Sequence, residues 1–293
     1  MTVINTNVAA TITANALTKN ERAMSQAMER LSTGQRINSA GDDAAGLAIS
    51  SRMTTYITGL DMAVRNANDA ISMIQTADGA LIEMTNMLQR MRELAVQASS
   101  GTYSATDRDA LNVEFEALTA AVEDIADDTQ WNGVSLLNGA SAFSFHVGAN
   151  ASQTISLTIA DFETEESSMT SGIFEALADG ATSNNDNSGD DLDGLDVDTV
   201  SNAGTAITRI DTAISRVNAH RATLGATINR LEYAADNLAN VSQNTLASRS
   251  RVLDADYASE TTELAKTQII QQAATAMLSQ ANQQAQSVLA LLK

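Results

Sequence analysis

Hydrophobic residues recur every three or four positions over most of the chain, the spacing of helices that bury one face against a neighbour. The clearest series lies in residues 53–74, where the gaps between apolar residues are 4, 3, 4, 3, 4 and 3. It continues, after an interruption at Asp78, through Leu81, Met84, Leu88, Met91 and Ala95. The mean gap of about 3.5 residues is the period of a coiled-coil seam. The pattern predicts one long helix over residues 44–100, which needs partner helices along its length.

Two later segments repeat this spacing and are the expected partners. Ser104 and Asp107 have the spacing of a capping box, and apolar residues follow at Leu111, Phe115, Leu118, Val122 and Ile125. Because Gly101 separates this segment from the first helix, we expect an antiparallel helical hairpin. The seam returns from about residue 201 to Leu238, with Arg221 at its one charged position. Together with the helix of residues 44–100, these two segments are expected to form a three-helix rod.

The residues between the second and third helices alternate as strands do. FSFHV (143–147) and TISLTI (154–159) flank the turn-forming residues GANASQ and predict a β-hairpin. Residues 43–160 and 200–249 together form the expected central rod. Residues 161–199 are polar and rich in Gly, Asn and Asp, so we expect a short surface insert that contributes nothing to a core. Deletion of residues 180–198 is expected to leave the assembly of copies of the chain intact.

The two chain ends, residues 1–42 and 250–293, are predicted to be helical. Apolar residues are sparse in the first, and the second is rich in small residues and apolar on one face. Neither end buries enough apolar surface to fold alone, so we expect both to become ordered against neighbouring copies of the chain. Asp42 or Asp43 is the expected cap of the long central helix. The predicted self-assembly seam comprises Ile4, Val8 and Ile12 at one end, and Ile270, Ala274, Met277, Ala281, Ala285, Val288 and Leu292 at the other.

Composition supports a mainly α, elongated fold and argues against catalysis. The 293 residues include no Pro, no Cys and only 3% aromatic residues, and proline is the residue that most often stops long helices. The absence of cysteine excludes disulfides and thiol chemistry. His146 and His220 are the only histidines and are far apart in sequence. We therefore expect no enzyme, no metal and no cofactor.

An acidic cluster near the end of the insert raises the question of a calcium loop. It comprises Asp190, Asp191, Asp193, Asp196 and Asp198. An EF-hand with Gly194 at its sixth position would need an acidic residue at 189 and Glu at 200. The chain has Gly189 and Val200 there, so solvated carboxylates are the better interpretation.

The net charge is −19, and it is concentrated in the middle of the chain. Residues 1–40 carry +2 and residues 250–293 carry −1, which leaves −20 for residues 41–249. Such acidity argues against nucleic acid as a partner. The sequence has no apolar run long enough to span a membrane and no recognisable secretory leader, so neither is expected.

Four motifs, three in the first 101 residues and one at the C-terminal end, resemble bacterial flagellin. They are MTVINTNVAA at the N-terminus, LSTGQRINSAGDDAAGLAISSRM (31–53), QRMRELAVQASSG (89–101), and the C-terminal RSRVLDADYASETTELAK with QIIQQAATAMLSQANQ. The resemblance covers roughly residues 1–160 and 200–293 and leaves out the insert. Relatives often have a proline near Ala285, where this chain reads QANQQAQSV.

The resemblance implies a structural subunit that self-assembles into the extracellular flagellar filament used for swimming. The two ends would form a coiled coil lining the inner tube of the filament, and the chain would be exported unfolded through the flagellar type III apparatus. Its implied partners are further copies of itself, an export chaperone, the filament cap and hook-associated proteins. Exposed Ser183 and Ser188 are candidates for O-glycosylation. The alternatives are a hook–filament junction protein and a host-directed ligand or adhesin.

The segment QRMRELAVQ also resembles the part of flagellins that an animal Toll-like receptor recognises. The resemblance assigns this recognition to Gln89, Arg90, Leu94 and Gln97, with Glu114 joining from the next helix. The competing interpretation is that Met91 and Leu94 only pack between helices while Arg90 is a solvated charge. Both interpretations can hold for one surface.

Overall fold

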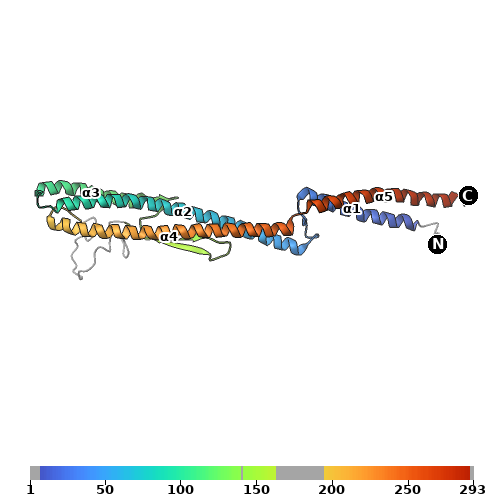
Figure 1. Cartoon of the computed structure of the whole chain (residues 1–293), viewed down its shortest axis with the longest axis horizontal. Coiled ribbons are helices and arrows are strands. Elements are labelled where there is room, and N and C mark those ends of the chain that lie inside the picture. Colours follow the sequence, from blue (N-terminus) through green and yellow to red (C-terminus); the bar gives the residue numbers. More distant parts are fainter. Residues whose placement is uncertain (1–6, 140, 163–194, 291–293) are drawn as a thin grey trace. The chain divides into compact units, whose positions relative to one another are not determined.

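The computed structural model describes residues 7–139, 141–162 and 195–290, and within them the predicted mainly α fold is confirmed (Figure 1). The described helices are α1 (Val8–Thr33), α2 (Ala44–Ala98), α3 (Ala105–Asp128), α4 (Val200–Leu253) and α5 (Tyr257–Ala290). The described strands are β1 (Gln130–Trp131), β2 (Val134–Ser135), β3 (Ser141–His146) and β4 (Thr154–Ile159). They pair as two antiparallel hairpins, β1–β2 and β3–β4.

Side chains next to the helix ends explain where the helices begin. Asp43 caps α2, because its Oδ1 accepts a hydrogen bond from the Gly46 N–H at 2.9 Å. Asp42 has another role: its Oδ2 accepts from the Asn38 and Ser39 N–H groups and holds the turn before the helix. The predicted capping box of α3 is confirmed, since Ser104 and Asp107 each accept from the backbone of the other.

The chain divides into two compact units. Unit 1 is Met1–Ile57 with Ser242–Lys293, and unit 2 is Thr58–Val241. The sequence-based boundaries near residues 42 and 250 follow the ends of helices, whereas the boundaries between the units fall within α2 and α4. The difference arises because α2 and α4 are uninterrupted helices of 55 and 54 residues that contribute to both units.

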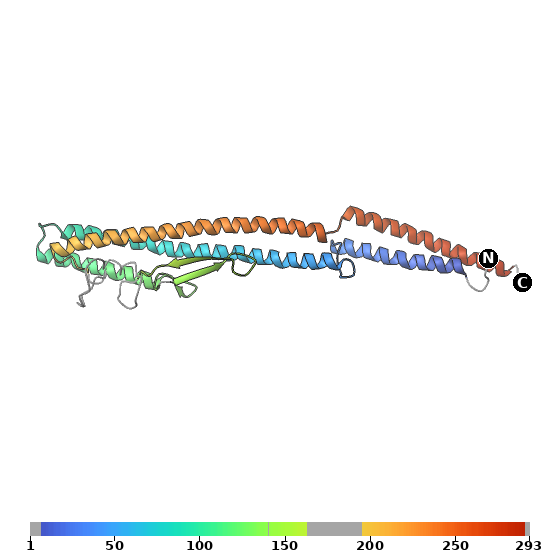
Figure 2. The ribbon, with the colours of Figure 1, turned by 90° about the horizontal axis from the view of Figure 1, so that it is seen from below.

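The core of unit 2 is the seam between α2, α3 and α4, which run side by side (Figures 1 and 2). Most residues of the periodic series are buried here, including Leu81, Met84 and Leu88 of α2, each 0% exposed. Phe115 of α3 and Val217 of α4 are also fully buried. The three helices therefore bury their apolar residues, which recur at heptad spacing, against one another, as the sequence predicts.

The two charged interruptions of the predicted seams meet each other. Asp78 interrupts the α2 series and Arg221 interrupts the α4 series, and the Arg221 Nε lies 2.7 Å from the Asp78 Oδ1. Their side chains remain 33% and 30% exposed, so the pair contributes modestly to stability. It links two helices that run antiparallel. A second α2–α4 ion pair, Arg92 with Asp211, has the same antiparallel sense.

The predicted hairpin is confirmed as β3–β4, with register pairs from Ser141↔Ile159 to His146↔Thr154. It packs on α2, where Asn66 Nδ2 donates to the His146 carbonyl oxygen at 3.1 Å. The shorter hairpin β1–β2 turns at Asn132-Gly133, and both residues have positive φ values, 50° and 79°. Asn-Gly is the residue pair that this tight turn favours.

The two ends of the predicted insert belong to the core of unit 2. Phe162 is 0% exposed, and on the far side of the insert Leu195 and Val197 are 6% and 0% exposed. The Val197 N–H also donates to Asn112 Oδ1 on α3 at 2.8 Å. The expectation that all of 161–199 contributes nothing to a core therefore does not hold at these ends. A deletion that reaches residue 198 removes buried apolar side chains.

Unit 1 contains the helix pair α1 and α5. Arg30 pairs with Glu260, and Asn7 Nδ2 donates to the Ala281 carbonyl oxygen, so the two helices run antiparallel. Cross-helix contacts to backbone oxygens also come from Asn20 and Tyr257. Among the described residues of α1 and α5, the buried side chains are Asn20, Ala27 and Thr267. This seam is thin and contains more polar groups than the seam of unit 2.

Candidate assembly and recognition surfaces

Helix α5 has three faces, which its burial pattern separates. One face packs on α1: Thr267 is 2% exposed and neighbouring positions at heptad spacing are half-buried. These positions are Leu264, Gln271, Ala274, Leu278 and Ala281. A polar face carries Gln268, Gln272, Thr275 and Ser279, all exposed. The third face is apolar and exposed.

We call this apolar surface, together with its counterpart on α1, the exposed terminal flank. On α5 it comprises Ile269, Ile270 and Met277, which are 66%, 42% and 61% exposed. On α1 it comprises Val8 and Ile12, which are 53% and 64% exposed. Large apolar side chains gathered on one side of a helix at this exposure are typical of a protein–protein contact.

The structure divides the predicted self-assembly seam between two faces. Val8, Ile12, Ile270 and Met277 lie on the exposed terminal flank, whereas Ala274 and Ala281 lie on the face that packs on α1. Ile269 belongs to the flank although the periodic series omitted it, because it stands beside Ile270 rather than at the next heptad position. Ile4 and Leu292 lie outside the described residues, as do the side chains of Ala285 and Val288.

The predicted receptor segment lies on α2 and α3, and the structure brings two of its charged residues together. Arg90 Nη2 lies 2.8 Å from Glu114 Oε1, and Arg90 Nη1 lies 3.0 Å from Glu93 Oε2. These side chains are roughly half exposed or more. Hydrogen bonds to Glu114 first, and then to Glu93, raise the pKa of Arg90. Gln89, one residue before, is also exposed.

The other two residues of that segment face differently. Leu94 is 1% exposed and belongs to the core of unit 2. Gln97 is half-buried, and its Nε2 donates to the Tyr103 hydroxyl at 3.2 Å. A partner that binds this surface can therefore contact Gln89, Arg90 and Glu114 directly, while Leu94 holds α2 in place from beneath.

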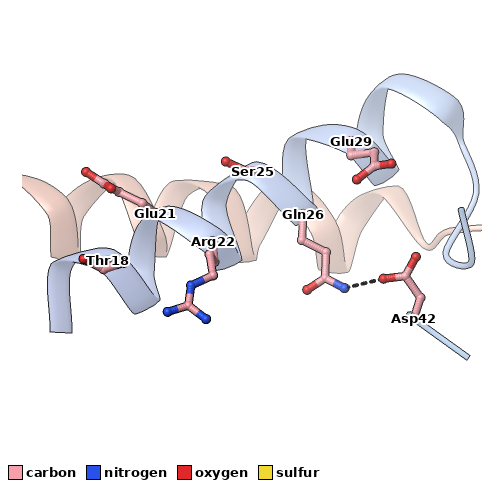
Figure 3. A pocket seen from close by; sticks show the side chains of 7 residues that line it. All are labelled: Thr18, Glu21, Arg22, Ser25, Gln26, Glu29 and Asp42. Atoms are coloured by element: carbon pink, nitrogen blue, oxygen red, sulfur yellow. Dashed lines mark hydrogen bonds between the residues drawn. The ribbon is translucent and has the colours of Figure 1, made fainter. Parts of the chain in front are cut away.

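A polar hollow lies on the outer side of α1 in unit 1 (Figure 3). Gln26 Nε2 donates across it to Asp42 Oδ1 at 2.8 Å. Hydrogen bonds from the Ser39 and Asn38 backbone hold the pKa of Asp42 below its usual value, so this carboxylate stays ionised and is unsuited to act as a general acid. Besides Asp42, the hollow is lined by six exposed residues of α1: Thr18, Glu21, Arg22, Ser25, Gln26 and Glu29.

No membrane-spanning helix is found among the described residues. Within the same residues, His, Cys, Asp and Glu side chains form no group of three or more that could hold a metal ion. The candidate glycosylation residues Ser183 and Ser188, and most of the acidic cluster near 190, lie outside the described part of the chain.

His220 of α4 is half-buried, whereas His146 is exposed, and we expect His220 to make unit 2 sensitive to acid. Its ring lies 5.4 Å from the ring of Phe162 in an edge-to-face arrangement. Its Nε2 is buried and has no hydrogen-bond partner among the described residues. Burial lowers the pKa of this imidazole, because the charged form is poorly solvated there.

We expect unit 2 to lose stability as the pH falls from 7.5 through the unfolded-state pKa of histidine, about 6.5. Below that pH the unfolded chain binds a proton that the folded chain does not, so stability rises with pH in this window. His220→Leu should remove this part of the pH dependence, and His146→Leu, at the exposed histidine, should keep it. Thermal melting at pH 7.5 and 5.5 measures the effect, and an equal slope for all three proteins would contradict it.

Comparison with known proteins adds two family matches. Residues 4–142 match the bacterial flagellin N-terminal helical region, and residues 207–292 match the bacterial flagellin C-terminal helical region. The chain is 46% identical to a flagellin of Halalkalibacterium halodurans over 92% of this chain and 91% of that protein. It is 43% identical to a flagellin of Bacillus subtilis over 99% of both chains.

One solved structure shares the fold at low sequence identity. It is that of a putative flagellar hook-associated protein from Vibrio parahaemolyticus, with a TM-score of 0.56 and 12% identity. The match covers 73% of this chain and all of that one. At this identity the likeness concerns the fold alone.

Proposed function

The chain belongs to the bacterial flagellin family and is a subunit of the flagellar filament, and we propose that copies bind one another through the exposed terminal flank. The observation that carries the proposal is the exposure of Val8 and Ile12 on α1 and of Ile269, Ile270 and Met277 on α5. The packed face of each helix is already occupied within the chain. A second copy can cover the remaining apolar surface and gain the free energy of its burial.

We further propose that the filament is extracellular and that the chain has a purely structural role. The strongly acidic composition supports the first point, because a net charge of −19 keeps exposed surfaces soluble. The likeness of the chain to flagellins supports the second. The likeness of flagellins to this chain supports export through the flagellar type III apparatus.

An apolar flank that binds copies of the chain has to be covered before the chain reaches the filament. This supports the proposal of an export chaperone that covers the flank before assembly, and of a filament cap that receives the chain afterwards. Hook-associated proteins are the proposed neighbours at the base of the filament. Their terminal helices would present the same kind of apolar flank as Ile270 and Met277 do here.

Polymerisation of the purified chain tests the proposed flank. Ile270→Gln combined with Met277→Gln should raise the critical concentration roughly 30-fold, the equivalent of about 2 kcal/mol of lost apolar burial. Sedimentation measures the critical concentration, and electron microscopy shows whether the pellet contains filaments. The melting of unit 2 should not change, because both residues lie in unit 1.

The polar face of α5 provides the matched control. Gln268→Asn combined with Gln272→Asn changes two exposed side chains on the same helix without removing apolar surface, and we expect it to polymerise like the unchanged chain. If the Ile270 and Met277 double variant also polymerised normally, copies would have to bind through some other surface. If the unchanged chain formed no filaments, the assembly proposal itself would fail.

A second candidate function, recognition by a Toll-like receptor, is favoured by the exposed pair of Arg90 and Glu114. A half-exposed guanidinium with two carboxylate partners, beside the exposed Gln89, offers directional hydrogen bonds to a partner. We propose that these three residues make the direct contacts. Leu94 and Gln97 would support them from within the fold.

Arg90→Ala should reduce activation of receptor-bearing reporter cells by about tenfold or more, the cost of losing a charge-assisted contact. Arg92→Ala is the matched control, because Arg92 lies two residues away, is similarly exposed, and pairs with Asp211 of α4 instead. We expect Arg92→Ala to retain activity. Equal activity of the two variants would refute the assignment of Arg90.

A further inference from the structure

The seam between α1 and α5 contains one buried amide. Asn20 is 8% exposed and Thr267 is 2% exposed, and Asn20 Nδ2 donates to the Thr267 carbonyl oxygen at 2.8 Å. Two of the three side chains buried on these helices, among the described residues, are therefore polar. An apolar residue at position 20 would pack better, so the asparagine is not explained by stability alone.

The apolar part of this seam does not define a single alignment. Half-buried residues recur at heptad spacing on both helices: Leu17, Met24 and Leu31 on α1, and Leu264, Gln271 and Leu278 on α5. If α5 slid along α1 by seven residues, about 10.5 Å, most apolar positions would again face apolar positions. The free energy from apolar burial would change little.

The polar contacts, by contrast, all belong to one alignment. Asn7 reaches the Ala281 carbonyl, Asn20 reaches Thr267, Arg30 pairs with Glu260, and the Tyr257 hydroxyl donates to the Leu31 carbonyl. A slide of seven residues separates all four pairs, and it also breaks the backbone bridge between Gln35 and Asp254, next to the ends of the two helices. Asn20 is the most buried donor among them, so it loses most when its partner moves away.

We propose that Asn20 is the buried side chain that keeps α1 and α5 in register along their seam in the filament subunit, beyond the backbone bridge of Gln35 with Asp254. This inference deepens the proposed function. The exposed terminal flank combines Val8 and Ile12 of α1 with Ile269, Ile270 and Met277 of α5. A slide would displace these two halves by about 10.5 Å. Copies in different registers would then present different surfaces, whereas a helical polymer needs the same surface from every copy.

Engineered disulfides can report the register, because the chain contains no cysteine. In the observed alignment residue 20 lies opposite 267 and residue 31 lies opposite 257. The cysteines of Met24→Cys with Leu264→Cys therefore lie opposite each other in this alignment. Met24→Cys with Gln271→Cys reports a slide of seven residues, and in the observed register these positions are too far apart to bridge. Each pair is introduced into the full chain, which is oxidised mildly before and after polymerisation. Intrachain disulfide is quantified on non-reducing gels.

With Asn20 present, we expect the 24–264 disulfide to exceed the 24–271 disulfide by at least about tenfold. Asn20→Leu and Asn20→Ala should each bring the two yields to within about threefold of one another. The melting temperature of unit 1 in Asn20→Leu should stay the same or rise. Ser25→Leu, an exposed position on the other side of α1, should keep the tenfold preference.

The inference is overturned if Asn20→Leu and Asn20→Ala keep the tenfold preference, or if Asn20→Leu melts at a lower temperature with an unchanged register. The second result would make Asn20 a stabilising residue only. If a variant forms no filaments, the yields of the two disulfides in the soluble chain show which register it adopts. Failure of the proposed function is a separate result, because it would appear as a lack of filaments in the chain that retains Asn20.

Discussion

Ala274→Asp should abolish filament formation under conditions in which the unchanged chain polymerises. Ala274 is half-buried on the face of α5 that packs on α1, at heptad spacing from the buried Thr267. A carboxylate there is partly removed from water against α1, at a cost of about 2 kcal/mol or more. The seam between α1 and α5 is thin, so this cost is enough to separate the two helices. The residues of the exposed terminal flank on α1 and on α5 then no longer form one surface.

The melting of unit 2 should remain unchanged in Ala274→Asp, since the residue belongs to unit 1. Thr275→Asp is the matched control: it adds the same charge one residue away, on the exposed polar face of α5. We expect Thr275→Asp to form filaments. Sedimentation and electron microscopy check both variants, and filaments of ordinary length from Ala274→Asp would refute the assignment of this face.

Phe115→Ala should have the largest effect on the stability of unit 2. Phe115 is 0% exposed and is among the largest fully buried side chains of the described residues. Its truncation removes apolar contact and leaves a cavity between the helices, at a cost of about 3–5 kcal/mol. For a unit of this size the melting temperature should fall by roughly 10 °C.

Val113→Ala is the control for this prediction, because Val113 lies on the same helix and is 67% exposed. Its effect should stay within about 0.5 kcal/mol. Calorimetry or circular dichroism at neutral pH measures both variants. A fall of only one or two degrees in Phe115→Ala would mean that α3 does not close the seam of unit 2 as the structure describes.

The periodic pattern was sufficient to predict most helices and many of the helical residues that unit 2 buries, although not Phe162, Leu195 and Val197 at the ends of the insert. Leu81, Met84 and Leu88 follow the predicted series, and each is fully buried. The capping box at Ser104 and the strand alternation of 154–159 likewise specify local structure. These features depend on short-range backbone preferences and on which side of one element is apolar, and both are written in neighbouring residues.

The candidate surfaces were less predictable. The sequence placed Ile270 and Ala274 in one seam, whereas the structure packs Ala274 on α1 and leaves Ile270 exposed. Leu94 occurs in the recognised motif but lies in the core. Arg221 and Asp78 appeared as two separate interruptions, and only the fold shows that they pair.

The sequence by itself therefore determined the mainly α fold, the positions of the helices and the family of the chain. The tertiary structure decided which apolar residues of α5 face α1 and which stay exposed, and it gave Asn20 its partner, Thr267. The physical reason is that a period of three to four residues records which side of a helix is apolar, but not what covers it. Contacts between residues 247 positions apart depend on how the helices align, and no local pattern contains that alignment.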